Sequence, residues 1–101
     1  ILSVPYSIEL NDSPAQVFRH HTGVDFEQMI VDHFDEMLLQ SEKYPLVFNI
    51  VMHPFVIGQP FRLRALRRAL DHILAQRDDL WITTPGGIAA YVATLPEGTL
   101  P

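Results

Sequence analysis

The stretch LVFNIVMHPFVIGQPFR, residues 46–62, is the part of the sequence that says most about the fold. It opens with an apolar run rich in β-branched and aromatic side chains, and this run ends at His53. Pro54 and Gly58 then interrupt the chain before a helix-like pattern begins. Enzymes of the α/β class mount reactive groups at the carboxyl ends of strands in this way. His53 is therefore the first candidate for a catalytic residue.

The sequence before this stretch predicts a first strand followed by a helix. Residues 1–10 have the composition of a strand, and the Asn-Asp-Ser-Pro sequence that follows supplies turn chemistry. Apolar residues then recur with helical spacing over residues 26–38. We expect this helix to begin near Asp25, which can cap its first turn, with Gln28 reaching back to the cap.

Two more helices are predicted downstream. The first has Pro60 in its first turn and places five apolar residues on one side, namely Leu63, Leu66, Leu70, Ile73 and Leu74. Residues 80–83 predict a short strand, after which Thr84 and Pro85 are the cap and first residue of the next helix. Residues 96–101 have turn composition and are expected to form a tail.

Alternating strands and helices favour an α/β fold of three β-α units with parallel strands. Three strands leave open edges and an apolar sheet face, so the unit should associate with a missing N-terminal part of its own protein or with another copy as a homo-oligomer. The chain opens inside a strand-like run without an initiator Met, which suggests a piece of something longer. The connection at residues 11–23 is long, so it is expected to line a site or to be mobile.

Composition narrows the class of protein. The net charge of -5 argues against a nucleic-acid partner, because binding the phosphate backbone needs a basic excess. The absence of cysteine excludes a disulfide framework and a thiolate metal site, and makes a cytoplasmic location the default expectation. The apolar runs are too short to span a bilayer, so no membrane partner is expected.

Few residues could carry chemistry. His53 could act as a general acid or base, because imidazole changes charge near neutral pH; alternatively it is a partly buried histidine bonded to a backbone group. Asn11 and Asp12 would reach the same rim as His53 if the two strands are parallel, although an Asn-Asp pair is also ordinary turn material. Arg62 lies at the loop-to-helix junction and could reach this rim to hold an anionic substrate.

Other candidates carry a weaker signal. His20 and His21 are adjacent and no third ligand follows at a known spacing, so a metal role is not favoured. His33 and His72 fit surface positions on helices, and the arginines at positions 64, 67 and 68 fit a solvated helix face. The sequence has no glycine-rich phosphate loop, serine nucleophile elbow or cysteine nucleophile, which disfavours covalent catalysis.

An ordered set of segments resembles the C-terminal part of polysaccharide deacetylase family proteins, nearest to the branch with allantoinase-like and peptidoglycan-deacetylase-like enzymes. The segments are residues 4–12, 34–38, 53–55, 58–62, 80–81 and 83–84. The resemblance implies residues 1–95 as the C-terminal part of a distorted (β/α) barrel. It also implies hydrolysis of carbon-nitrogen bonds that are not peptide bonds, in sugar N-acetyl groups or small ureide-like molecules.

Carried over by position, the resemblance makes His53 the general acid toward the leaving nitrogen. It makes Asn11 and Asp12 pocket-lining residues that meet the substrate, and gives Arg62 a structural or rim role. The family's early Asp-Asp and His-x-x-x-His motifs, which bind a divalent metal such as zinc, have no match here, so this chain is not expected to bind the metal fully by itself. The alternative is a free-standing, non-catalytic α/β module that binds a protein partner through an open sheet edge.

Overall fold

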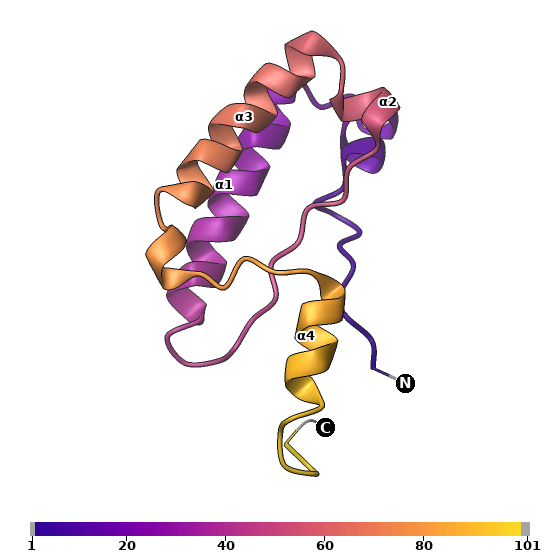
Figure 1. Cartoon of the computed structure of the whole chain (residues 1–101). Helices are drawn as coiled ribbons and strands as arrows, with labels where there is room; N and C mark the ends of the chain where they lie inside the picture. The colour runs from indigo at the N-terminus through magenta and orange to yellow at the C-terminus, as the bar shows by residue number, and fades with distance from the viewer. Residues whose placement is uncertain (1, 100–101) are drawn as a thin grey trace.

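A computed structural model describes residues 2–99 of the chain (Figure 1). Its elements are, in order, η1 (Ser13–Phe18, a π-helix), α1 (Gly23–Gln40), α2 (Pro54–Ile57), α3 (Pro60–Leu74), η2 (Arg77–Asp79, a 3₁₀ turn) and α4 (Pro85–Val92). Residue 1 and residues 100–101, at the ends of the predicted first strand and tail, lie outside the described part.

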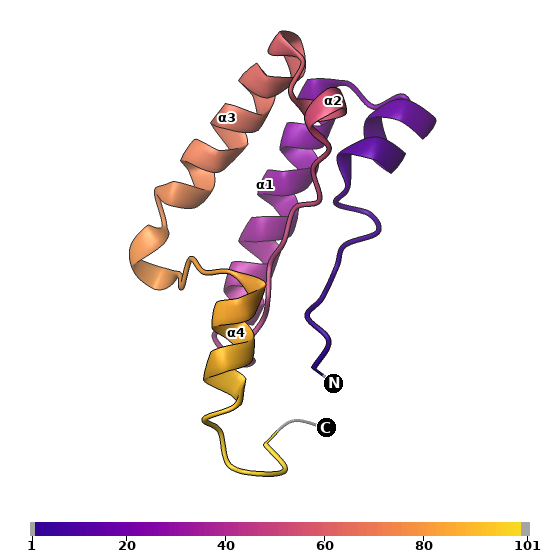
Figure 2. The ribbon, with the colours of Figure 1, turned by 45° about the vertical axis from the view of Figure 1, so that its right-hand side comes forward.

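The long helices α1 and α3 lie side by side, and both begin at the same end of the pair (Figures 1 and 2). The backbone of Gly23, where α1 begins, comes close to Arg62 and Ala65 in the first turns of α3. The predicted apolar faces meet between the two helices: Phe26 and Ile30 pack with Leu66 and other buried residues in one core cluster. Burying side chains of this size stabilises the fold by about 2 kcal/mol each.

The prediction of three β-α units with parallel strands, as in part of a (β/α) barrel, is wrong. The described residues contain no sheet, and their single β contact is an isolated parallel bridge between Asn11 and Val51. The strand-like runs over residues 2–10, 46–52 and 80–83 lie in irregular chain (Figure 2). β-Branched and aromatic residues suit a strand, but a strand also needs neighbours to pair with, and here those neighbours do not come together. The open sheet edge expected for partner binding is therefore absent from residues 2–99.

Two local predictions also need correction. Helix α1 begins at Gly23, and its N-cap is Thr22, three residues before the expected cap Asp25; the Thr22 hydroxyl accepts from the backbone N–H of Asp25. The stretch at residues 11–23 is not simply a loop, because it contains η1. The other two starts are confirmed, with Pro60 in the first turn of α3 and Thr84 capping α4 ahead of Pro85.

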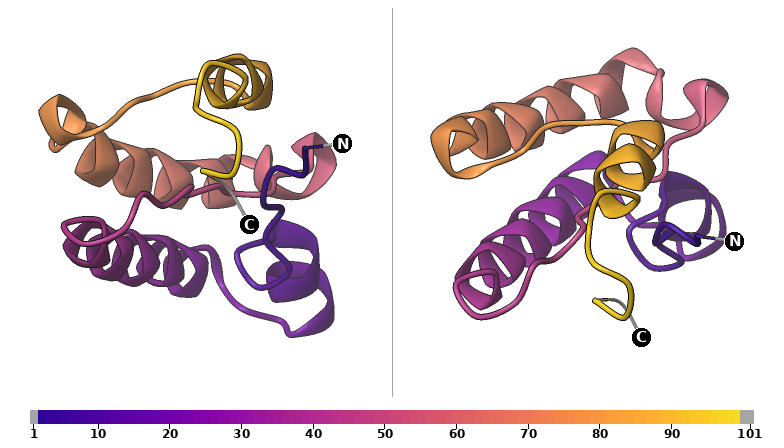
Figure 3. Two further views of the ribbon diagram at one scale, coloured as in Figure 1. Left: turned by 90° about the horizontal axis from the view of Figure 1, so that it is seen from below. Right: turned by 60° about the horizontal axis from the view of Figure 1, so that its bottom comes forward.

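Helix α4 stands apart from the main pair. Seen from below, α1 and α3 lie together while α4 lies to one side (Figure 3). None of its residues is buried, and its contact with the rest of the chain includes the edge-to-face pair of Trp81 and Tyr91. Within residues 2–99 no helix is both long and apolar enough to cross a membrane.

Candidate functional site

Asp12 and His53 meet at the isolated parallel bridge. The bridge is closed by two backbone hydrogen bonds, Asp12 N to Val51 O at 3.1 Å and Val51 N to Leu10 O at 3.0 Å. It places the two segments in register, so that the residues just beyond it lie next to each other. The backbone N–H of His53 donates to Asp12 Oδ2 at 2.8 Å, and His53 Nδ1 lies 2.7 Å from Asp12 Oδ1. The two residues form one hydrogen-bonded unit, which we call the Asp12–His53 pair.

The pair is buried on the Asp12 side and open on the His53 side. The Asp12 side chain is 0% exposed, and His53 engages both of its carboxylate oxygens. The His53 side chain is 35% exposed. Because a carboxylate only accepts hydrogen bonds, the proton between the two side chains belongs on Nδ1 of the ring. Nε2 is then the ring nitrogen left for a further partner.

The elements around the pair fix its geometry. Asp12 is the N-cap of η1, and His53 is the N-cap of α2 with extended backbone angles. Pro54 follows at the first position of α2, where its missing N–H costs nothing. The ring of Phe55 lies 5.6 Å from the His53 ring, centroid to centroid, and is exposed. Helix α2 thus holds the imidazole at the surface beside an aromatic side chain.

Asn11 and Arg62 take supporting positions. Asn11 is buried, and its Oδ1 accepts from the backbone N–H of Ser13 at 3.2 Å. Arg62 donates from Nη1 to the carbonyl oxygen of Val56 at 3.2 Å, and its guanidinium lies 5.0 Å from the centre of the Phe61 ring. Asn11 therefore braces the turn behind Asp12, and Arg62 ties α3 to α2. Neither side chain has a hydrogen bond to the Asp12–His53 pair in the described structure.

The remaining histidines lie elsewhere. His72 Nε2 is 2.6 Å from Asp35 Oδ1, a contact between α3 and α1, and His33 packs near Phe48. His20 and His21 follow η1. Across residues 2–99, no group of three or more His, Cys, Asp or Glu side chains could hold a metal ion. The donor set in this part of the chain does not fit a complete metal centre.

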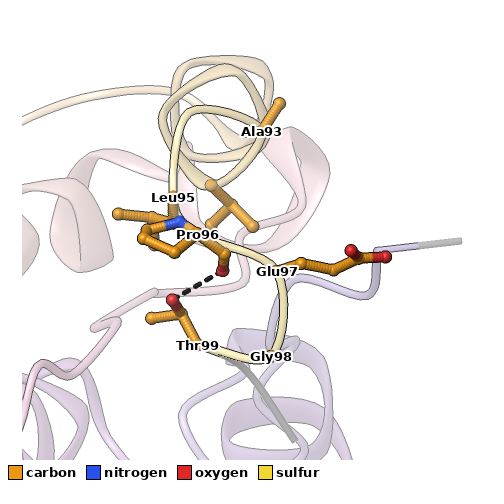
Figure 4. A pocket seen from close by; sticks show the side chains of 7 residues that line it. Ala93, Leu95, Pro96, Glu97, Gly98 and Thr99 are labelled. Atoms are coloured by element: carbon orange, nitrogen blue, oxygen red, sulfur yellow. Dashed lines mark hydrogen bonds between the residues drawn. The ribbon is translucent and has the colours of Figure 1, made fainter.

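Two hollows in the surface do not include the Asp12–His53 pair. One is formed by the end of α4 and the chain after it, residues 92–99, where the Thr99 hydroxyl donates to the Pro96 carbonyl at 2.7 Å (Figure 4). The other, at the end of α1, is lined by Leu39, Gln40, Glu42, Lys43 and Tyr44. Each is made by one short segment of chain. Neither brings together side chains from separate elements, so neither competes with the pair as a candidate site.

Sequence reasoning missed one side chain that holds the pair's surroundings together. Asn49 Oδ1 accepts from the backbone N–H of Ser7 at 2.9 Å, and Asn49 Nδ2 donates to the carbonyl oxygen of Pro5 at 3.0 Å. These bonds fasten the chain before η1 to the chain before His53. The signal was present as an asparagine inside an otherwise apolar run, because a polar side chain there needs a hydrogen-bond partner.

Comparison with known proteins gives one informative match. No protein-family model matches the chain, and no solved structure matches it. A protein of Schizosaccharomyces pombe (strain 972 / ATCC 24843) that carries the description "Putative polysaccharide deacetylase" is 31% identical over 91 residues. The match takes in 88% of this chain, which spans 28% of that protein's length. This similarity supports a distant relationship between the chain and polysaccharide deacetylases.

Proposed function

We propose that this chain supplies the proton donor of a deacetylase-like hydrolase that cleaves carbon-nitrogen bonds other than peptide bonds. The observation that carries the proposal is the Asp12–His53 pair, in which a buried carboxylate holds Nδ1 of a surface imidazole. The distant similarity to a protein described as a "Putative polysaccharide deacetylase" supports this reaction class. The His-Pro-Phe sequence that carried the family resemblance lies at this pair.

In the proposed reaction His53 acts through Nε2. Protonated at both nitrogens, the imidazole donates Nδ1–H to Asp12 and presents Nε2–H to the nitrogen of the scissile bond. When the carbon-nitrogen bond of the tetrahedral intermediate breaks, the proton passes from Nε2 to the departing nitrogen, which leaves as a neutral amine. The Asp12 carboxylate fixes the tautomer and orients the ring.

The structure suggests a changed role for Asp12. Sequence reasoning gave Asn11 and Asp12 direct contact with the substrate, but Asp12 is sealed from solvent and both of its oxygens are already used. We therefore propose Asp12 as a positioning residue for His53. Asn11 and Arg62 are proposed to support the rim, the first by bracing the turn at Ser13 and the second by holding α2.

Under this proposal, the chain contains only some of the groups that the reaction needs. The family motifs that bind a divalent metal and activate water have no match in these 101 residues. We propose that such groups, where used, come from a covering N-terminal part of the protein or from another copy, and that the substrate is an N-acetylated carbohydrate or a small amide-like molecule.

The test is the replacement His53→Ala in the complete natural protein. Loss of a general acid is expected to lower turnover of an N-acetylated oligosaccharide by about 100-fold or more. An anilide substrate whose leaving nitrogen is weakly basic needs less protonation, so its turnover should fall much less. His72→Ala, which removes a surface histidine paired with Asp35, is the matched control. Equal turnover by His53→Ala and the unaltered protein would remove the acid role.

A further inference from the structure

The side chain of Asn49 takes the place of a backbone peptide group. Its Nδ2 donates to the carbonyl oxygen of Pro5 at 3.0 Å, and its Oδ1 accepts from the backbone N–H of Ser7 at 2.9 Å. The backbone of Val51 makes the same pair of bonds across the parallel bridge, one given and one received. The chain before η1 and the chain before His53 are therefore tied at two points, once by backbone and once by a side chain.

The two ties are spaced differently along the two segments. Along the chain before His53 they are two residues apart, whereas along the chain before η1 they are five apart, facing positions 6 and 11. The surplus is taken up by residues 8–10, which bend, and the Ser7 hydroxyl closes this bend by accepting from the N–H of Leu10 at 2.8 Å. Surplus residues in one of two paired segments re-aim the side chains that follow, as β-bulges do beside active sites. The bend therefore decides which residue lies opposite His53.

The register matters because Asp12 is the first residue beyond the bridge. Its carboxylate accepts from the backbone N–H of His53 and lies 2.7 Å from Nδ1 of the ring. A slip of one residue would put Asn11 or Ser13 in its place, and neither carries a carboxylate. The bridge itself contributes two backbone hydrogen bonds, so the two bonds from Asn49 double the number that hold the segments in step.

We propose that Asn49 is a positioning residue for His53, and that Ser7 assists it by closing the bend. Asn49 acts through the register that brings Asp12 to the imidazole. The inference rests on the proposed function for its effect on turnover, because the proton donation by His53 is what loses its orientation. Since Asn49 acts on the orientation of the acid and not on substrate binding, its loss should lower kcat and leave KM unchanged.

Two substitutions separate this role from general stability. Asn49→Leu keeps the size of the side chain, suits the apolar run around it and removes both bonds. Ser7→Ala removes only the bond that closes the bend, so it is the milder change and serves where Asn49→Leu does not fold. The matched controls lie on α1 or at its end. Gln28→Leu removes a carboxamide bonded to Asp32, and Ser41→Ala removes a hydroxyl bonded to a backbone carbonyl.

The main readout is NMR of the complete natural protein labelled with ¹⁵N-histidine, recorded without denaturant across a pH series. His53→Ala identifies the His53 ring signals. In Asn49→Leu these signals should move from those of a ring protonated at Nδ1 toward those of an unrestrained histidine. The value of kcat should fall about tenfold at unchanged KM, as the loss of two neutral hydrogen bonds predicts. Ser7→Ala should move both quantities in the same direction by a smaller amount, and the controls should move neither.

Unchanged His53 signals in either variant that folds would overturn the inference, even with a lower urea midpoint, because the bonds would then only stabilise the fold. Equal responses in the control variants, or a rise in KM in place of the fall in kcat, would overturn it too. The His53→Ala turnover test stands apart from these outcomes. The acid role can fail while the His53 signals still show whether Asn49 sets the register.

Discussion

At the scale of single residues, the numbers of hydrogen-bond donors and acceptors determine how Asp12 and His53 interact. A carboxylate offers only acceptors, and the two nearest donors, the backbone N–H and Nδ1 of His53, use one oxygen each at 2.8 and 2.7 Å. Because Asp12 is fully buried, water cannot replace either donor. The imidazole is therefore held by two bonds to one side chain, and its orientation depends on that side chain remaining a carboxylate.

Asp12→Asn tests this dependence. The amide keeps the shape of the side chain but replaces one carboxylate oxygen by an NH₂ group, so the charged acceptor is lost and Nδ1 of His53 must change from donor to acceptor to keep its bond. We expect the free energy of unfolding to fall by about 1–3 kcal/mol, measured by urea denaturation. NMR of the His53 ring should show that Nδ1–H is no longer the dominant tautomer. Asp79→Asn, a change at an exposed position, should stay within about 0.5 kcal/mol of the parent chain. An unchanged tautomer would contradict the orienting role.

At the scale of elements, the start of α1 is fixed by a reciprocal cap. The Thr22 hydroxyl and the Thr22 backbone N–H both donate to Asp25 Oδ2, each at 2.7 Å, and the Asp25 N–H donates back to the hydroxyl. These hydrogen bonds lower the pKa of Asp25 from its ordinary value of 3.8. The bond from the Thr22 hydroxyl has the largest effect, and the bond from the Thr22 backbone N–H comes second. A carboxyl group whose pKa is lower in the folded than in the unfolded chain stabilises the fold at pH values above its unfolded pKa. This contribution is lost as the pH falls through the lower pKa of the folded chain.

Thr22→Ala should therefore lower the free energy of unfolding by about 1 kcal/mol at neutral pH, the usual cost of losing an N-cap. The deficit should shrink well below pH 3.8, because the protonated Asp25 no longer gains from the hydroxyl in the parent chain. Urea denaturation of both proteins at the two pH values measures this. Thr94→Ala, which removes a hydroxyl bonded to Tyr91 O beyond α4, should show no such pH dependence. A deficit that is the same at both pH values would contradict the linkage.

The short helix α2 depends on the glycine that ends it. A Cβ added at Gly58 would overlap the carbonyl oxygen of Pro54, which already accepts from the Gly58 N–H. Gly58→Ala should therefore open this turn, cost about 1–3 kcal/mol, and disturb the NMR signals of the His53 ring. Gly86→Ala is the matched control, since a Cβ there meets nothing closer than 3.8 Å and alanine favours the helix. Equal stability of the two variants would show that α2 adapts without cost.

At the scale of the whole molecule, α1, α3 and α4 could be predicted from the sequence, whereas η1, α2 and the assembly of the elements could not. The helical spacing of apolar residues that predicted α1 and α3 is a local signal, and so are Pro60 and the Thr84–Pro85 start of α4. The predicted helices are therefore present in the structure. Strand pairing depends on distant partners, which composition does not reveal, and the strand-like runs stay unpaired except at Asn11 and Val51. That single parallel bridge brings Asp12 to His53, so the expected meeting occurs without the expected sheet.

The uneven packing of the molecule makes the same substitution costly in one place and harmless in another. Ile30 is 0% exposed between α1 and α3, whereas Ile82 is 64% exposed in the irregular chain before α4. Removing one methylene from Ile30 loses its burial and leaves a small cavity, so Ile30→Val should cost about 0.5–1.5 kcal/mol. Ile82→Val should be neutral, because the methylene is already in water. In hydrogen exchange the amides of α1 and α3 should be the most protected, and those of α4, which buries no residue, should exchange far sooner. Equal costs for the two isoleucines would mean that Ile82 is covered in the natural protein by a surface outside this chain, and protection of α4 would then locate that contact.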